Sequence, residues 1–160
     1  MREAVGQLGV RDFDFLVGAW NVSNRRLARR LEGSTEWHEF PGSSDCRLIL
    51  DGRGNIDEIT APMRDLCGMT LRLFDSARDE WVLYWADSRD GILQPPVVGR
   101  FKGGRGEFYG DDTHEGVAIR VRYIWSEITP SSARWDQAFS TDRGRSWETN
   151  WIMEFVRVSP

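Results

Sequence analysis

The sequence is poor in lysine and cysteine, and each shortage limits the functional classes to consider. Lys102 is the only lysine among 21 basic residues, and because a GC-rich gene accounts for such a bias, it carries no functional inference. The two cysteines, Cys46 and Cys67, can form at most one disulfide, which excludes the disulfide framework of a small secreted domain. Both lie in apolar, strand-like segments and are expected to be buried free thiols.

Long apolar segments are absent as well. No segment approaches the roughly 20 apolar residues that span a bilayer, and residues 1–10 lack the apolar core of a signal peptide. The cytoplasm is therefore the expected location. Charged residues make up 29% of the chain, with acids and bases interspersed, and the net charge is −4. This balance disfavours nucleic acid and anionic membranes as partners.

Eight tryptophans stand out against this background. Side chains of that size, at this density, either build a broad core or line a pocket. A chain of 160 residues is long enough for one domain with a core of its own. We expect residues 1–12 to form an N-terminal arm and residues 13–158 to form a single domain.

Short alternating segments predict that this domain is all β. One helical turn is expected at 12–18, with Asp12 as its cap, and whether 27–31 continues as a ribbon or turns helical stays open. Strands are expected around 20–24, 35–40, 45–50, 55–60, 66–74, 81–87, 97–101, 105–109 and 117–125, followed by a terminal hairpin over 134–157. A turn at Pro41-Gly42 separates two of them. This spacing predicts an antiparallel up-and-down β-barrel of about ten strands, because closure removes exposed sheet edges.

The terminal hairpin is expected to close through a three-residue loop, Asp142-Arg143-Gly144. The register that follows places three pairs on one face: Phe139 with Trp147, Gln137 with Thr149, and Trp135 with Trp151. A two-residue loop would shift every side chain to the other face and bring Asp136 beside Trp151.

Two further segments are expected to carry an apolar face: 117–125, which extends the aromatic face of the terminal hairpin, and 66–74, which pairs with 81–87. In 117–125 the predicted pairs are Trp125 with Trp135, Tyr123 with Gln137, and Val121 with Phe139. In 66–74 the apolar face is expected to carry Cys67, Met69, Leu71 and Leu73, with Leu73 opposite Trp81. That register places Asp87 at the polar end of the same face, beside Trp85.

Several segments resemble one protein family. They are the opening Phe13-Asp14-Phe15-Leu16-Val17-Gly18-Ala19-Trp20, then Tyr84-Trp85-Ala86-Asp87, Pro95-Pro96-Val97-Val98-Gly99-Arg100-Phe101, and Ser140 to Trp151. Together they resemble an uncharacterised bacterial domain-of-unknown-function family of the calycin/lipocalin-like superfamily. The Gly-x-Trp opening implies that Trp20 packs at the closed end of the barrel under an arginine of the last strand, which is Arg157 here. The family has no established activity, and it more often has a second glycine where this chain has Arg143.

The first functional hypothesis is that the barrel binds a small apolar or aromatic molecule. The expected inner face is aromatic and includes Trp20, Met69, Phe139, Met153 and Phe155, with a few polar groups among them, which is the usual composition of a small-molecule site. The candidate ligand-binding residues are Asn24, Trp85, Asp87, Tyr123, Trp125, Trp135, Gln137, Thr149 and Trp151. The alternative is that the aromatic side chains fill the barrel and the polar groups satisfy each other.

A second hypothesis is an enzyme that uses Asp87 for acid/base chemistry. Burial beside Trp85 would raise the pKa of its carboxyl. Asp57 or Glu58 is a candidate second carboxylate, although the sequence leaves open which face of 35–40 and of 55–60 points inward. No nucleophile elbow, phosphate loop or Ser/His/Asp arrangement supports catalysis.

Bound cofactors and metals are not expected. Nitrobindin-like barrels of the same superfamily bind haem through a histidine late in the chain, whereas the histidines here, His38 and His114, lie outside the last strands. The acidic segment with Asp111, Asp112, His114 and Glu115 matches no metal-binding loop and is expected to be a solvated hairpin tip. A homodimer stays open.

Overall fold

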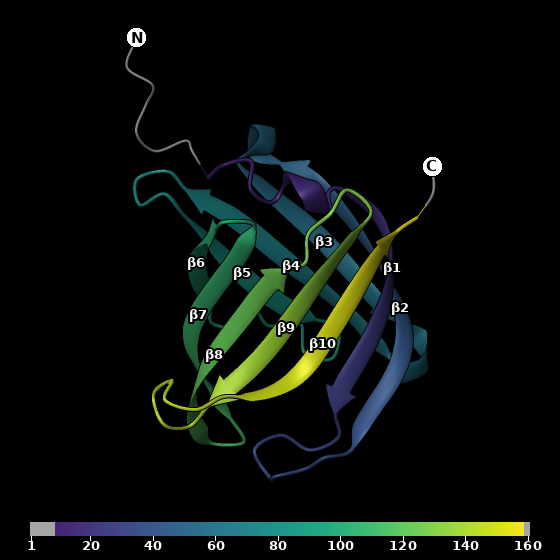
Figure 1. Cartoon of the computed structure of the whole chain (residues 1–160), viewed down its shortest axis with the longest axis vertical. Coiled ribbons are helices and arrows are strands. Elements are labelled where there is room, and N and C mark those ends of the chain that lie inside the picture. The colour runs from purple at the N-terminus through teal and green to yellow at the C-terminus, as the bar shows by residue number, and fades with distance from the viewer. Residues whose placement is uncertain (1–8, 159–160) are drawn as a thin grey trace.

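Ten antiparallel strands form one closed barrel in the computed structural model, which describes residues 9–158 (Figure 1). The strands are β1 (Gly18–Leu27), β2 (Trp37–Ile49), β3 (Gly54–Ala61), β4 (Leu66–Asp75), β5 (Glu80–Asp87), β6 (Val97–Lys102), β7 (Arg105–His114), β8 (Val117–Ser126), β9 (Ser132–Ser140) and β10 (Glu148–Arg157). Three 3₁₀ turns accompany them: η1 (Asp14–Leu16), η2 (Leu50–Gly52) and η3 (Pro62–Arg64). The predicted fold class is confirmed. Within the described residues, no helix has the length and apolarity to cross a membrane.

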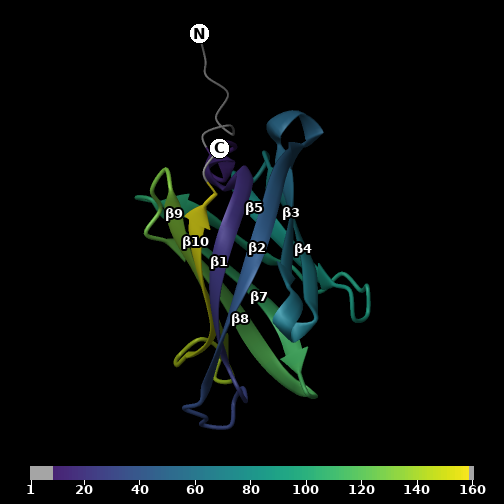
Figure 2. The same ribbon diagram turned by 90° about the vertical axis from the view of Figure 1, so that its right-hand side faces the viewer.

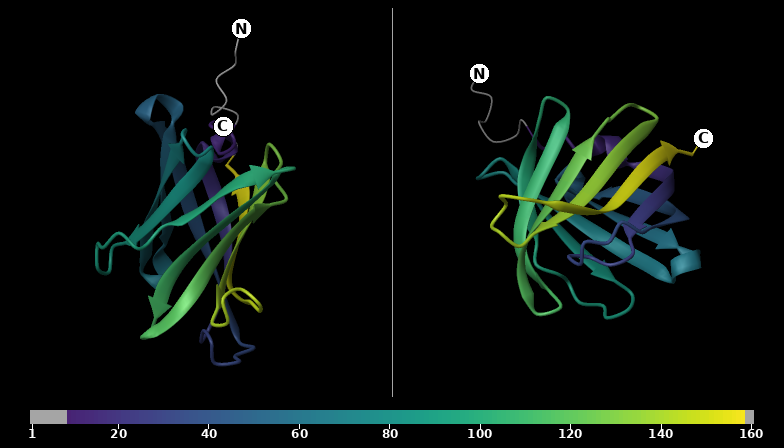
Figure 3. Two further views of the ribbon diagram at one scale, coloured as in Figure 1. Left: turned by 90° about the vertical axis from the view of Figure 1, so that its left-hand side faces the viewer. Right: turned by 60° about the horizontal axis from the view of Figure 1, so that its bottom comes forward.

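Each strand pairs with its neighbours along the chain, and β1 pairs with β10 to complete the barrel. All connections therefore lie at one of two ends (Figure 2). The closed end carries η1 and the start of β1. The opposite end, here called the mouth, carries the connections that follow β1, β3, β5, β7 and β9, and it comes forward in the right-hand view of Figure 3.

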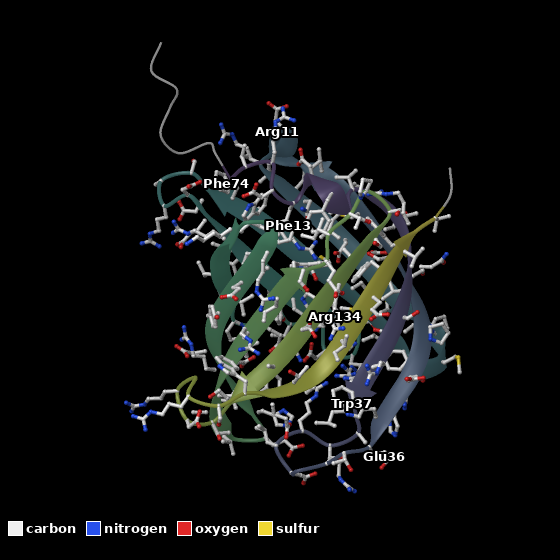
Figure 4. The ribbon with its side chains drawn as sticks, viewed as in Figure 1. Arg11, Phe13, Glu36, Trp37, Phe74 and Arg134 are labelled. Atoms are coloured by element: carbon white, nitrogen blue, oxygen red, sulfur yellow. The ribbon has the colours of Figure 1, made fainter. Side chains whose placement is uncertain are left out.

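The closed end is sealed by η1 and by a stacked pair. Phe13 and Leu16 are buried there, and Phe13 lies far from Trp37 at the mouth (Figure 4). The Arg157 guanidinium lies 4.1 Å from the Trp20 ring centroid, so the predicted contact is present. The same guanidinium donates hydrogen bonds of 2.7 Å to the carbonyls of Phe15 and Val17.

The start of the described chain also packs at this end. The Trp81 indole donates a 3.0 Å hydrogen bond to the carbonyl of Gly9. Residues 9–12 of the expected arm therefore contact the barrel, and residues 1–8 lie outside the described residues. The helical turn is shorter than expected: η1 begins at Asp14, and its N-cap position is Phe13, with no side-chain cap. Residues 28–32 form bends rather than a helix.

The expected turn at Pro41-Gly42 is wrong, because β2 runs through both residues as one long strand. Pro41 pairs with Ser23 of β1, whereas β3 pairs with β2 only from Ser43 onward. Proline lacks the N–H that a central strand would need. It is tolerated here because this part of β2 has no partner on its β3 side.

The expected inward face of β4 is also wrong. Its inward residues are Leu66, Gly68, Thr70, Arg72 and Phe74, all of them buried, whereas Cys67 is exposed and Met69, Leu71 and Leu73 are half-buried. Phe74, not Leu73, lies opposite Trp81. The outward face is thus the more apolar one, because the inward face holds a buried ion pair and a glycine that accommodates an indole. Cys46, by contrast, is buried as expected.

The predicted register of the terminal hairpin is wrong: Glu148 and Thr149 pair with Phe139 and Ala138, as the two-residue loop would place them, and beyond a bulge the register matches neither version. The connection between β9 and β10 spans residues 141–147. Within it, the Asp142 carboxylate accepts hydrogen bonds from the Ser140 hydroxyl at 2.7 Å and from the Ser146 N–H at 2.9 Å. A bulge between Thr149 and Trp151 then places Trp151 opposite Gln137. Trp147 lies outside the barrel, stacked under Arg122 at 4.5 Å. The pairing of β8 with β9, in contrast, is the predicted one.

Candidate functional site

The interior of the barrel is almost filled. Its remaining cavity measures about 40 Å³. A water molecule occupies about 30 Å³ in the liquid, so this space suits a single water better than a ligand. The lining residues are Ile59, Thr70, Arg72, Leu83, Trp85, Tyr123, Trp125, Trp135, Gln137, Trp151, Met153 and Phe155.

A larger cavity lies directly above it, at the mouth. It measures about 210 Å³, and its walls include Pro95, Pro96 and Val121. Four side chains line both cavities and so form the floor of the mouth: Trp85, Tyr123, Gln137 and Trp151. We call these four residues the neck.

The neck is built from aromatic contacts between strands that are distant in sequence. Trp151 of β10 meets Trp85 of β5 edge to face at 6.1 Å between ring centroids. Its other side meets Trp135 at 5.5 Å, and Tyr123 lies 5.0 Å from Trp135. Gly68 makes room for Trp85, because a Cβ at that position would lie 1.9 Å from the indole. The result is a rigid aromatic floor.

Polar partners hold the neck in place. The Trp151 indole donates a 3.0 Å hydrogen bond to Asn24, and the Gln137 amide donates a 2.8 Å hydrogen bond to Asn150. Both asparagines are fully buried. Burial also raises the pKa of Tyr123 to about 12, so its hydroxyl stays protonated and can donate a hydrogen bond.

Two further donors in the inner cavity have no acceptor. The Trp125 indole nitrogen and the Nε atom of Arg72 are buried, and neither has a hydrogen-bond partner among the described residues. Buried polar groups are nearly always paired, with protein or with water. Trp125 and Arg72 therefore each contribute an unpaired donor to the residues around the inner cavity.

Arg72 belongs to an ion pair inside the barrel. Its Nη1 atom lies 2.8 Å from the Asp57 carboxylate and donates a 2.9 Å hydrogen bond to Asn55. The Arg72 and Asp57 side chains are 4% and 1% exposed. Asp57 thus points inward, whereas Glu58 is exposed, which answers the question that the sequence left open for β3.

Most of the candidate ligand-binding residues line one of the two cavities. They are Trp85, Asp87, Tyr123, Trp125, Trp135, Gln137 and Trp151. Asn24 lies behind Trp151 and positions its indole. Thr149 lies before the bulge, opposite Ala138, and lines neither cavity. The predicted pairing of Gln137 with Thr149 is therefore wrong, since Trp151 lies opposite Gln137 and the Gln137 amide donates its hydrogen bond to Asn150.

Asp87 does not have the raised pKa expected of a buried acid. It lies at the mouth, where its carboxylate pairs with Arg89 at 2.8 Å. Hydrogen bonds from Arg89 lower the pKa of Asp87 and outweigh the opposing effect of burial. The carboxyl is thus ionised near neutral pH and unsuited to act as a general acid.

Arginines surround the mouth, and none of them was among the candidate site residues predicted from the sequence. Arg26, Arg30 and Arg89 line both the mouth cavity and an adjoining outer hollow of about 460 Å³, which Arg64 also lines. The sequence contained one signal, the run Arg25-Arg26-Leu27-Ala28-Arg29-Arg30 at the end of the first strand. We call Arg26, Arg30, Arg64 and Arg89 the mouth arginines.

Both histidines also lie at the mouth rather than inside the barrel. His38 and His114 line the outer hollow, and the ring of His114 lies 5.6 Å from that of Phe139. Within residues 9–158, no group of three or more His, Cys, Asp or Glu side chains could hold a metal ion.

No protein-family profile and no curated protein sequence matches this chain. Among solved structures, the chain is similar to the S-type phycobiliprotein lyase CPES from Guillardia theta, with a TM-score of 0.58, 12% identity and 99% of each chain covered. At that identity, the likeness supports the closed β-barrel fold alone. A redesigned β-barrel and EF1p2_mFAP2b bound to DFHBI also match, at 11% and 13% identity. Each covers 93% of this chain, with 96% and 98% of its own length matched, and at a TM-score of 0.38 neither bears on function.

Proposed function

We propose that this protein binds a small aromatic molecule at the mouth of its barrel, with the ring system of the ligand lying on the neck. The observation that carries the proposal is that Trp85, Tyr123, Gln137 and Trp151 line both the mouth cavity and the inner cavity. They offer an aromatic floor with polar groups, open to one side, which is the composition of a small-molecule site.

The sizes of the two cavities support a ligand position above the neck. The inner cavity of about 40 Å³ is too small for a ring system, since small-molecule sites measure about 300 to 1,000 Å³. The mouth cavity of about 210 Å³ continues into the outer hollow, which provides the remaining volume. The body of the ligand therefore rests above the neck and not deep in the barrel.

The alternative functions have less support. General-acid catalysis by Asp87 would need a carboxyl that is protonated near neutral pH, whereas Arg89 lowers its pKa; the same lowering makes the ionised carboxylate a weaker general base. A barrel with a filled interior agrees with the small inner cavity but leaves the aromatic floor of the mouth without a role. We further propose, on the sequence motifs, membership of an uncharacterised bacterial family of calycin-like proteins and a cytoplasmic location.

A neutral fluorescent ligand tests the proposal. N-phenyl-1-naphthylamine, which gains fluorescence in apolar surroundings, is titrated into the protein, and energy transfer from tryptophan reports its place. Val121, which is buried and lines the mouth, is replaced in a Val121→Phe variant. We expect that variant to bind at least about tenfold more weakly, a loss of about 1.4 kcal/mol.

The matched control is Val156→Phe, because Val156 is 57% exposed on the outer wall of β10. Its affinity should equal that of the unmodified protein. Absence of saturable binding to the unmodified protein, or equal affinity in the two variants, would show that the mouth is not the site.

A further inference from the structure

The mouth arginines converge from parts of the chain that are far apart. Arg26 lies at the end of β1, Arg30 in the connection to β2, Arg64 in η3 and Arg89 in the connection after β5. All four lie at the same end of the barrel and line the same outer hollow. Positive charge from three connections is thus gathered around one opening.

Three of these arginines have no carboxylate partner. Among the described residues, Arg26, Arg30 and Arg64 form no ion pair within 4.0 Å. Each instead lies over an aromatic ring: Arg26 over Trp151 at 4.5 Å, Arg30 over Phe139 at 5.6 Å, and Arg64 over Phe40 at 5.3 Å. These cation–π contacts do not use the guanidinium N–H groups as carboxylate partners would, so the N–H groups can bind another acceptor.

The local electrostatics favour an added negative charge. Burial and then repulsion from Arg30 and Arg89 lower the pKa of Arg26 to about 10, against a weaker attraction from Asp87. Burial and repulsion from Arg89 also lower the pKa of Arg30. Half-buried cations that repel one another are stabilised when an anion binds between them.

The acids of the same region are mostly engaged elsewhere. Asp87 pairs with Arg89, Glu32 with Arg29 at 3.7 Å, and Asp111 with Arg120 at 3.5 Å. Asp112 accepts a hydrogen bond from the N–H of Thr113, and Glu115 is exposed on the turn after β7. None of these acids forms an ion pair with Arg26 or Arg30 within 4.0 Å among the described residues.

We infer that the ligand carries an acidic group, a carboxylate or a phosphate, which Arg26 and Arg30 bind at the mouth while its ring system lies on the neck. Arg26 joins the two halves of the site, because the ring it covers, Trp151, is part of the neck. Guanidinium groups bind both carboxylate and phosphate through paired hydrogen bonds. This inference rests on the function proposed above.

The test compares naphthalene compounds that differ only in their polar group. 2-Naphthoate, 2-naphthyl phosphate and the neutral 2-naphthamide are each used to displace N-phenyl-1-naphthylamine from the protein. We expect the acids to displace it at about tenfold lower concentration than the amide. The acid with the larger preference identifies carboxylate or phosphate as the natural group.

Variants then assign the preference to the arginines. Arg26→Gln and Arg30→Gln should each reduce the preference for the acids over the amide, measured within the same variant, by about fivefold to tenfold. Near-UV circular dichroism of the buried tryptophans shows that each variant has folded. Arg47→Gln is the matched control, because Arg47 is exposed on the outer wall of β2, and it should keep the full preference.

The outcomes separate the two proposals. If the neutral probe does not bind to the unmodified protein, the proposed function is wrong, and this inference falls with it. If the probe binds but the amide displaces it as well as the acids do, only the inference is overturned. It is also overturned if both arginine variants keep the preference.

Discussion

Removing one partner of the buried ion pair should destabilise the protein strongly. Asp57 and Arg72 lie 2.8 Å apart with exposed fractions of 1% and 4%, so bulk water does not reach either partner. In an Asp57→Asn variant the volume is kept, but Arg72 is left as a buried cation without a counter-charge. Breaking such pairs costs about 3 to 5 kcal/mol. For a chain of this length, that corresponds to a fall in Tm of about 6 to 20 °C.

The matched control is Glu58→Gln, the same chemical change one residue along β3. Glu58 is exposed, so its loss should alter the free energy of unfolding by less than about 0.5 kcal/mol. Urea unfolding followed by tryptophan fluorescence measures both variants, with the slope of each transition checked against that of the unmodified protein.

A double variant measures the interaction between the Asp57 and Arg72 charges. Asp57→Asn combined with Arg72→Met removes both charges, so it should be less destabilised than the sum of the two single variants. The reasoning is refuted if Asp57→Asn costs no more than Glu58→Gln, or if the two single effects add. Either result would mean that water reaches Asp57 and Arg72.

Two further predictions concern single side chains. In the native protein only Cys67 should react with a thiol reagent such as DTNB near neutral pH, because Cys67 is exposed. Cys46 is buried, and burial raises the pKa of its thiol to about 11. If two thiols react before unfolding, the orientation of β4 is contradicted. The carboxyl of Asp87 should titrate below the ordinary aspartate value of about 3.9, since Arg89 lowers its pKa. The stability that this pair contributes is therefore present above the ordinary value and is lost as the pH falls through the lowered one. In an Arg89→Gln variant the midpoint of the Asp87 titration, followed by NMR, should rise, because burial then acts without the opposing hydrogen bonds from Arg89, and an unchanged midpoint would refute the pairing.

The alternation of apolar and polar residues determined much of the barrel. Strands β8 and β9 show this alternation on their inward faces, where every residue is apolar or aromatic apart from Gln137. The pairing of Tyr123 with Gln137 and of Trp125 with Trp135 could therefore be predicted. The contact of Trp20 with Arg157 followed from the Gly-x-Trp opening and the position of an arginine on the last strand.

Where inward positions are polar or small, alternation pointed the wrong way. On β4 the inward face contains Gly68, Thr70 and Arg72, and these residues belong there only because Trp85 fills the space over Gly68 and Asp57 neutralises Arg72. Both partners come from other strands. A pattern within one strand carries no information about them.

The candidate site, like the barrel, could be predicted from the sequence only in part. The sequence by itself determined an aromatic inner face with Trp85, Tyr123, Gln137 and Trp151 on it, because burial of large apolar side chains is a local, periodic signal. Only the tertiary structure decided that a bulge turns Trp151 toward Gln137 and that Asn150, not Thr149, holds the Gln137 amide. Barrel closure likewise gathers Arg26, Arg30, Arg64 and Arg89 around one mouth. Charges on separate connections meet only when the strands between them have paired, so no single segment of the sequence could reveal the cluster.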